Sequence, residues 1–576
     1  MTPFSVWAPT AGRVEVVIGD LRLAMNEVGH GWWFAEASVS APVDYQFCVD
    51  GGDPLPDPRS PWQPHGVHGP SRYVDHASFA WQCDAWPGGE LLGSVVYELH
   101  VGTFTDDGTF DAAIDRLDHL VSLGVDFVEL LPVAAFPGSR GWGYDGVFPY
   151  AVQDSYGGPD GLKRFVDACH SRGLRVVLDV VYNHLGPDGN VLPRFGPYFT
   201  DKFATPWGQA VNFSDAGSDE VRRYFVDNAL MWLRDYRFDA LRLDAVHAIV
   251  DTSATHLLEE LSVSVAGLSR ELGRPLWLIA ESDLNDPRLI SPRDLGGYGL
   301  DAQWSDDFHH ALHSVVTGET FGYYEDFGSL HELATALSRG FVFAGNHSKH
   351  RDRRHGRPLP ASVASTRLLG YAQNHDQIGN RARGERIAAL TSSDLVKVTA
   401  ALVLLSPFTP MLFMGEEWAA STPWQYFTDH QDPQLAESVR KGRRNEFKAF
   451  GWEPSQVPDP QDVDTMRRSV LDWTEVSRAP HDDVLRWHRE LIELRRANPV
   501  LQTGCFPSVS VDEPARLLVV DHGPLVVVAN FGSAQATHPV EGERLLLSSA
   551  AASVSDDLLR LAPSSVAILA RETSSG

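Results

Sequence analysis

The chain has 576 residues, more than one hydrophobic core usually supports, so we expect two to four domains. Its formal net charge of −28 argues against nucleic acid or an anionic membrane as the main partner, because both require clustered cations. No apolar run approaches the roughly 18 residues that a membrane span needs. The first residues show no basic stretch followed by an apolar one, and the 4 Cys have no pairing or metal-ligand spacing. We therefore expect a cytoplasmic protein with reduced thiols.

Residues 1–90 carry short alternating strands, such as 14–18 and 45–49, which are broken by Gly, Pro and Asp turns. This pattern predicts a small N-terminal β-sandwich of the starch-binding-like or early-set kind. Such a module could bind sugar or could serve only to pack against the next domain. The chain becomes strand-rich again over 498–576, which predicts a second, C-terminal β-sandwich.

Between them, over 91–497, strand-like runs alternate with segments of helical periodicity. Repeated strand, helix, strand order predicts an α/β domain, a parallel (β/α)8 TIM barrel with right-handed crossovers. A long connection at about 185–218, rich in Gly, Pro and aromatic residues, is expected to form an excursion over the barrel mouth. The eight predicted strands are 95–99, 127–131, 175–181, 239–243, 276–280, 300–304, 368–372 and 411–414.

Several predicted strands end in charged or polar residues, and in a barrel these ends meet on one rim. Asp244, Glu281 and Asp376 therefore predict a carboxylate site suited to glycosidic-bond chemistry. Arg242 lies two residues before Asp244 on the same strand face, which makes Asp244 the better nucleophile candidate. Glu281 ends an apolar strand, so partial burial would raise its pKa as a general acid requires. Asp376, next to a histidine, suits a third role in gripping sugar hydroxyls.

Four segments resemble the signature regions of the α-amylase superfamily: DVVYNH at 179–184, FDALRLDA at 238–245, AES at 280–282 and NHD at 374–376. The resemblance implies a retaining mechanism with Asp244 as nucleophile, Glu281 as acid/base and Asp376 as transition-state stabiliser. It also implies site-shaping roles for Asp179, Asn183, His184, Arg242 and His375.

A closer resemblance limits the range of expected substrates. GWGYDGV at 141–147 is similar to glycogen branching enzymes and to maltooligosyltrehalose trehalohydrolases alike, whereas DDFHH at 306–310, QNHDQIGNRAR at 373–383 and MLFMGEEW at 411–418 resemble the trehalohydrolases. This implies cleavage of the α-1,4 bond next to the terminal trehalose of maltooligosyl trehalose, releasing trehalose. The alternatives are a branching transferase of the same superfamily and, more remotely, a non-catalytic glucan-binding protein.

The resemblance also extends the set of expected substrate contacts, and Tyr144 is a candidate platform under the sugar at the cleavage point. The implied functional partner is a maltooligosyltrehalose synthase that supplies the substrate. No cofactor is expected, and the i,i+4 spacing of His309 and His313 is not enough to predict a metal site. The remaining candidate contacts are Leu243, Ala245, Val246, His247, Asp306, Asp307, Phe308, His309, His310, Asn374, Gln377, Ile378, Gly379 and Asn380.

Overall fold

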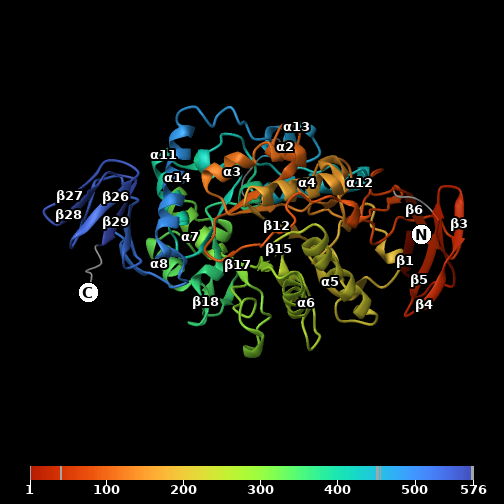
Figure 1. Cartoon of the computed structure of the whole chain (residues 1–576). Coiled ribbons are helices and arrows are strands. Elements are labelled where there is room, and N and C mark those ends of the chain that lie inside the picture. Colours follow the sequence, from red (N-terminus) through yellow and green to blue (C-terminus); the bar gives the residue numbers. More distant parts are fainter. Residues whose placement is uncertain (1, 39–41, 449–452, 454–455, 572–576) are drawn as a thin grey trace.

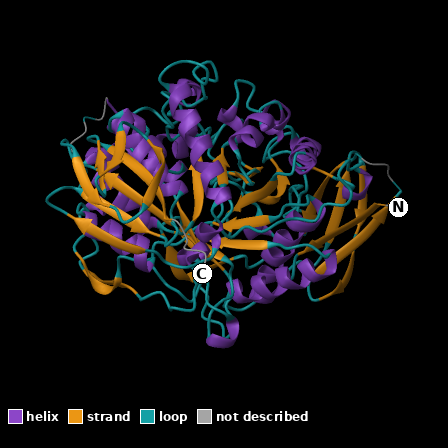
Figure 2. Ribbon diagram, turned by 60° about the vertical axis from the view of Figure 1, so that its left-hand side comes forward, coloured by secondary structure: helices purple, strands orange, loops and turns teal. Residues whose placement is uncertain are grey.

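The computed structural model describes residues 2–38, 42–448, 453 and 456–571. A barrel occupies the middle of the molecule, with the N-terminal strands at one end and the C-terminal strands at the opposite end (Figure 1). Helices surround the central strands, whereas the two end bodies are built mainly of strands (Figure 2). This arrangement confirms the predicted fold class.

Two antiparallel sheets form the N-terminal body. The alternation of buried and less buried residues along strand β2 explains why it forms a sheet with one face in the core. Val14, Val16 and Ile18 are buried, and the residues between them are not. Trp7 of the first sheet packs edge-on against Tyr198 of the excursion, with ring centroids 5.4 Å apart, so this body contacts the barrel domain. The two sheets are β1 (Thr2–Trp7), β5 (Trp32–Ala37) and β4 (Asn26–Gly29), and β3 (Leu21–Ala24), β2 (Val14–Ile18), β6 (Asp44–Val49) and β7 (Ser71–Arg72).

The central domain is a closed barrel of parallel strands in the order β12-β15-β16-β17-β20-β21-β8-β9. All eight predicted strands are present, although seven are one or two residues shorter than expected and the last is one residue longer. The strand expected to reach residue 372 ends at Gly370, so Asp376 lies beyond it on the short helix α9 (His375–Gly379). The bounds are β8 (Val96–Leu99), β9 (Phe127–Leu130), β12 (Arg175–Val180), β15 (Ala240–Leu243), β16 (Trp277–Ala280), β17 (Ala302–Trp304), β20 (Leu368–Gly370) and β21 (Thr409–Phe413).

The barrel interior is layered by the same alternation. A lower apolar layer includes Val96, Phe127, Val177, Ala240 and Ile279, which form one buried cluster. Two positions further along each of these five strands, the inward side chains are ionisable. This upper layer, directly below the rim, consists of Glu98, Glu129, Asp179, Arg242 and Glu281.

The helices cover the outside of the barrel. A helical segment between β8 and β9 begins after Thr109, whose hydroxyl accepts from Ala112 N, and ends at Gly124, which adopts φ 96°. The segment between them is broken in two at residues 115–116. The main helices are α2 (Phe110–Ile114), α3 (Leu117–Leu123), α4 (Gly158–Ser171), α5 (Ser218–Asp235), α6 (Leu257–Leu272), α7 (Asp306–Thr317), α8 (Leu330–Arg339), α11 (Ser393–Leu404), α12 (Pro433–Lys448) and α14 (His481–Ala497).

The excursion contains a hairpin of β13 (Phe199–Thr205) and β14 (Gly208–Val211). The C-terminal body has two antiparallel sheets, one of β22 (Ser508–Asp512), β23 (Leu517–Asp521), β24 (Leu525–Asn530), β29 (Ser565–Arg571) and β26 (Glu543–Ser548), the other of β25 (Ala536–Pro539), β28 (Leu558–Leu561) and β27 (Ala552–Ser555). The boundaries at residues 90 and 497 stay predictions. Within the described ranges, no helix combines the length and the apolar character needed to cross a bilayer.

Candidate active site

A cavity of about 770 Å³ opens at the carboxyl ends of the barrel strands. Three carboxylates from three separate segments reach it, Asp244 after β15, Glu281 after β16 and Asp376 on α9. The sequence places these segments far apart, and the parallel barrel brings their ends to one rim. The full lining is Trp142, Tyr144, Asp145, His184, Pro206, Trp207, Asp244, Ala245, His247, Glu281, Asp376, Asn380, Tyr426, Val439, Gly442, Arg443 and Glu446.

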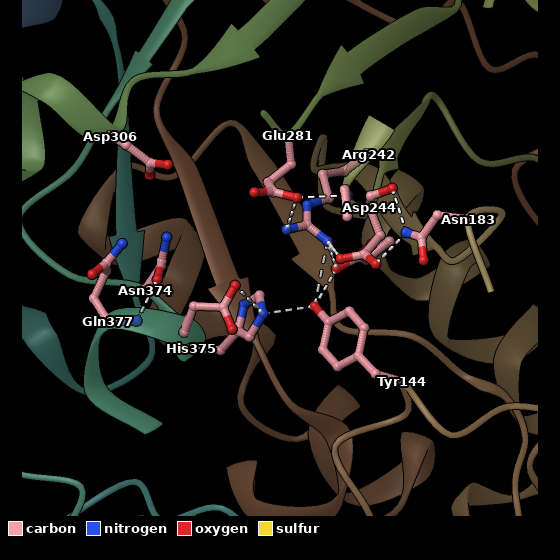
Figure 3. A network of polar contacts seen from close by, with 12 residues as sticks. Tyr144, Asn183, Arg242, Asp244, Glu281, Asp306, Asn374, His375 and Gln377 are labelled. Atoms are coloured by element: carbon pink, nitrogen blue, oxygen red, sulfur yellow. Dashed lines mark hydrogen bonds and ion pairs between the residues drawn. The ribbon is translucent and has the colours of Figure 1, made fainter. Parts of the chain in front are cut away.

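Arg242 is fully buried and lies at the centre of the upper layer of the barrel interior (Figure 3). Its Nη1 donates to Asp179 Oδ2 at 2.7 Å and to Asp244 Oδ1 at 2.8 Å, and its Nη2 lies 3.8 Å from Glu281 Oε2. The guanidinium also lies 4.2 Å from the centroid of the Trp304 ring. One planar cation therefore fixes two carboxylates through hydrogen bonds and stands at ion-pair distance from the third.

Asp244 is held through both of its oxygens. Asn183 Nδ2 donates to Oδ2 at 2.7 Å, while Arg242 holds Oδ1. The Asp244 side chain keeps only 10% exposure and faces the cavity. These contacts leave the carboxylate little rotational freedom, as an attacking group requires.

Glu281 has a different environment. Its Oε2 accepts one hydrogen bond from Ala245 N at 2.6 Å. Ala245 adopts a left-handed conformation, φ 38° and ψ 51°, which is uncommon for a residue with a side chain. Burial raises the pKa of Glu281 to about 8, with Arg242 opposing the rise and Asp244 adding to it. Glu281 therefore keeps its proton at neutral pH.

His375 and Tyr144 connect Asp376 to the Asp179 carboxylate. Burial disfavours a charged imidazole, but the Asp376 and Glu98 carboxylates outweigh it and raise the pKa of His375 to about 9. The imidazolium Nε2 lies 2.7 Å from the Tyr144 oxygen and 3.4 Å from Asp376 Oδ2. Tyr144 in turn donates to Asp179 Oδ2 at 2.5 Å. The phenol and the imidazole also stack, with centroids 5.1 Å apart.

The structure brings many of the predicted residues to the cavity and places others beneath it. Tyr144, His184, Ala245, His247 and Asn380 line the cavity together with the three carboxylates. Asp179, Asn183, Arg242 and His375 lie below and orient the lining groups. Asp306 accepts from Tyr371 at 2.5 Å, and with Gln377 it lies on the opposite side of the site from Arg242 in Figure 3.

Several residues that were expected to touch substrate make framework contacts in the structure, and their contact with substrate stays a prediction. Asp307 accepts from the backbone of Val342 and Phe343, and Phe308 packs on Phe408. His309 uses both ring nitrogens, on Ala372 O and the Tyr324 hydroxyl. The others are buried by neighbouring groups: Leu243, Val246, His310, Ile378, Asn374, whose side chain caps α9, and Gly379, where a Cβ would meet Trp142 at 1.9 Å.

Sequence reasoning missed several lining residues. Trp207 stacks on His184 with centroids 4.5 Å apart and planes 4° apart, and it comes from the tip of the excursion hairpin. Trp207 and Trp142 stand in Gly- and aromatic-rich stretches, which could have indicated them. Arg443 and Glu446 of α12 carried no such signal, because this helix is polar on most of its surface. Across the residues that the structure describes, no three His, Cys, Asp or Glu side chains group as metal ligands would.

The barrel and its carboxylates define an α-amylase-type glycoside hydrolase, and comparisons with known proteins agree. The family described as "Alpha amylase, catalytic domain" matches residues 79–194, and "Domain of unknown function (DUF3459)" matches residues 508–568. A crystal structure of a putative α-amylase from Salmonella typhimurium is 38% identical and superposes with a TM-score of 0.91, covering 99% of this chain and 97% of that one.

Two curated relatives define the family more narrowly. The malto-oligosyltrehalose trehalohydrolase of Arthrobacter ramosus is 55% identical, covering 91% of this chain and 92% of the relative. The trehalohydrolase of Rhizobium sp. (strain M-11) is 51% identical, covering 98% and 97%. The chain belongs to the malto-oligosyltrehalose trehalohydrolase family.

Proposed function

We propose that this hydrolase cleaves the α-1,4-glucosidic bond next to the terminal trehalose of maltooligosyl trehalose, with retention of anomeric configuration. The observation that carries the proposal is the placement of Asp244 and Glu281 around one guanidinium in different environments. Asp244 is firmly held by two donors, whereas Glu281 is a carboxylic acid that keeps its proton. Retaining glycosidases need this pairing of an attacking carboxylate with a protonated partner.

The reaction follows in two displacements. Glu281 gives its proton to the glycosidic oxygen as Asp244 attacks the anomeric carbon, so the C–O bond breaks, trehalose leaves and a glycosyl ester forms on Asp244. Glu281, now ionised, takes a proton from water. That water attacks the same carbon, the ester bond breaks, and Asp244 and protonated Glu281 are restored.

Asp376 and Tyr144 are proposed to act on the sugar at the cleavage point. The Asp376 side chain is 41% exposed and can accept hydrogen bonds from ring hydroxyls, which would favour the distorted ring of the transition state. Tyr144 offers the face of its ring, held by His375 and Asp179.

The leaving trehalose is proposed to lie against the wall that α12 and Tyr426 form. Arg443 lies 5.2 Å from the Tyr426 ring centroid, and Glu446 lies one turn further along the helix. Trehalose has many hydroxyls, so hydrogen-bonding side chains and an aromatic face suit it. A substrate of this kind requires an enzyme that converts the reducing end of a maltooligosaccharide into a trehalose unit, and we propose such a synthase as the functional partner.

The proposed acid role predicts an alkaline limit to activity. Because the pKa of Glu281 is raised to about 8, the group is protonated below that pH and loses its proton above it. We expect kcat/KM to be highest below pH 8 and to fall about tenfold per pH unit well above it. A profile from pH 5 to 10 on maltotriosyl trehalose tests this. An activity already lost near pH 5, the range of an ordinary Glu, would contradict the assignment.

Product analysis tests the reaction itself. With maltotriosyl trehalose and maltopentaose assayed side by side by chromatography, we expect trehalose and maltotriose from the first and at least about tenfold slower cleavage of the second. A tenfold preference corresponds to about 1.4 kcal/mol of differential transition-state binding. Longer or branched glucans without trehalose would indicate a branching transferase and refute the proposal. Bound glucan without any product would indicate a binding protein and refute it equally.

A further inference from the structure

Glu98 stands near the end of β8, in the upper layer of the barrel interior. It is not among the residues that line the cavity. It is 1% exposed, and both of its oxygens contact the same residue. Oε1 lies 2.5 Å from Nδ1 of His375, and Oε2 accepts from the backbone N–H of His375 at 3.0 Å. One carboxylate therefore fixes both the ring and the main chain of His375.

This contact matters because of where Asp376 is. Strand β20 ends at Gly370, so Asp376 is not carried by the sheet but by the first turn of the five-residue helix α9. Glu98 reaches that turn from β8, which is separated from β20 by β21 in the barrel. The contact ties the loop that carries Asp376 to a rigid strand.

We propose that Glu98 is a positioning residue for glycosidic cleavage, which acts through His375 to hold Asp376 and the Tyr144 platform in place. His375 transmits the constraint on both sides, through its neighbour Asp376 along the chain and through its Nε2, 2.7 Å from the Tyr144 oxygen. The role rests on the hydrolysis proposed above, and it concerns the sugar at the cleavage point rather than the leaving trehalose.

The chain offers a matched control in Glu129, which stands directly beside Glu98 in the register of β8 and β9. Neither oxygen of Glu129 has a hydrogen-bond partner among the described residues. Burial, with the charge of Glu98 beside it, raises the pKa of Glu129 far above its usual range, which favours its neutral form. Glu129→Gln keeps the shape of a side chain that holds no other described group, whereas Glu98→Gln removes one of the two acceptors that hold His375.

The experiment measures kcat and KM on maltotriosyl trehalose for the wild type, E98Q, E129Q, H375A and E98Q/H375A. We expect E98Q to lower kcat about 30-fold with KM changed less than about threefold, because Asp376 acts mainly in the transition state. E129Q should keep kcat within about twofold. In the H375A background the E98Q change should cost less than about threefold, since the residue through which Glu98 acts is gone.

An equal loss in E129Q, or the full 30-fold loss from E98Q in the H375A background, would overturn the role, as would an unchanged kcat in E98Q. If E98Q does not fold, judged by its thermal unfolding, E98D keeps the charge and is expected to retain more activity than E98A, and equal activities of the two would overturn the role. A wild type that releases no trehalose would refute the proposed function instead, so the two failures are distinguishable.

Discussion

Replacing Asp244 by Asn is expected to lower kcat by about 10⁴-fold or more, the order of magnitude for losing a covalent nucleophile. An amide cannot form the glycosyl ester, and its NH₂ would face Nδ2 of Asn183 or the Arg242 guanidinium, both donors. Arg242 would keep its contact with Asp179 at 2.7 Å, so the fold should persist. Steady-state kinetics on maltotriosyl trehalose, with thermal unfolding as the check on folding, measure the effect.

The loss should not depend on the leaving group. An α-maltooligosyl fluoride, which needs little protonation to depart, should also be inert with D244N. If D244N retained more than about a hundredth of wild-type kcat on either substrate while folded, Asp244 would not be the nucleophile.

Replacing Glu281 by Gln is expected to lower kcat on maltotriosyl trehalose by about 10³ to 10⁴-fold, the range for a lost general acid. Gln has the shape of the protonated acid but cannot donate the proton to the glycosidic oxygen. Its hydrogen bond with Ala245 N can be retained through the amide oxygen, so the geometry of the turn should survive.

Here the leaving group should decide the size of the effect. The first step on an α-maltooligosyl fluoride needs no proton, so E281Q should show a rapid burst of fluoride and then slow turnover, since the second step still lacks a base. An equal loss of fluoride release and trehalose release in the first turnover would show that Glu281 is not the acid.

The eight barrel strands could be predicted from the sequence because each is a short apolar run bounded by turn residues. Their ends were less accurate. Residues 371 and 372 are apolar enough to extend a strand, yet the ladder stops at Gly370. The helical segment between β8 and β9 breaks at residues 115–116, a feature that apolar periodicity alone does not indicate.

The site was predictable where a side chain belongs to a strand end and not where it depends on packing between distant segments. Asp244 and Arg242 follow from one strand, since alternate residues share a face. Arg443 could not be foreseen, because α12 reaches the cavity only through tertiary packing. Phe308 and Asp307 stand in a motif, and the structure uses them to pack α7 and to anchor the backbone of residues 342–343, so their contact with substrate stays a prediction.

The most direct measurement is covalent trapping at the cleavage point. E281Q incubated with a 5-fluoro-α-maltooligosyl fluoride should accumulate the glycosyl-enzyme, and peptide mass mapping should place the added sugar on Asp244. A sugar found on another residue, or an enzyme that releases product from the trapping reagent without ever carrying it, would contradict the account.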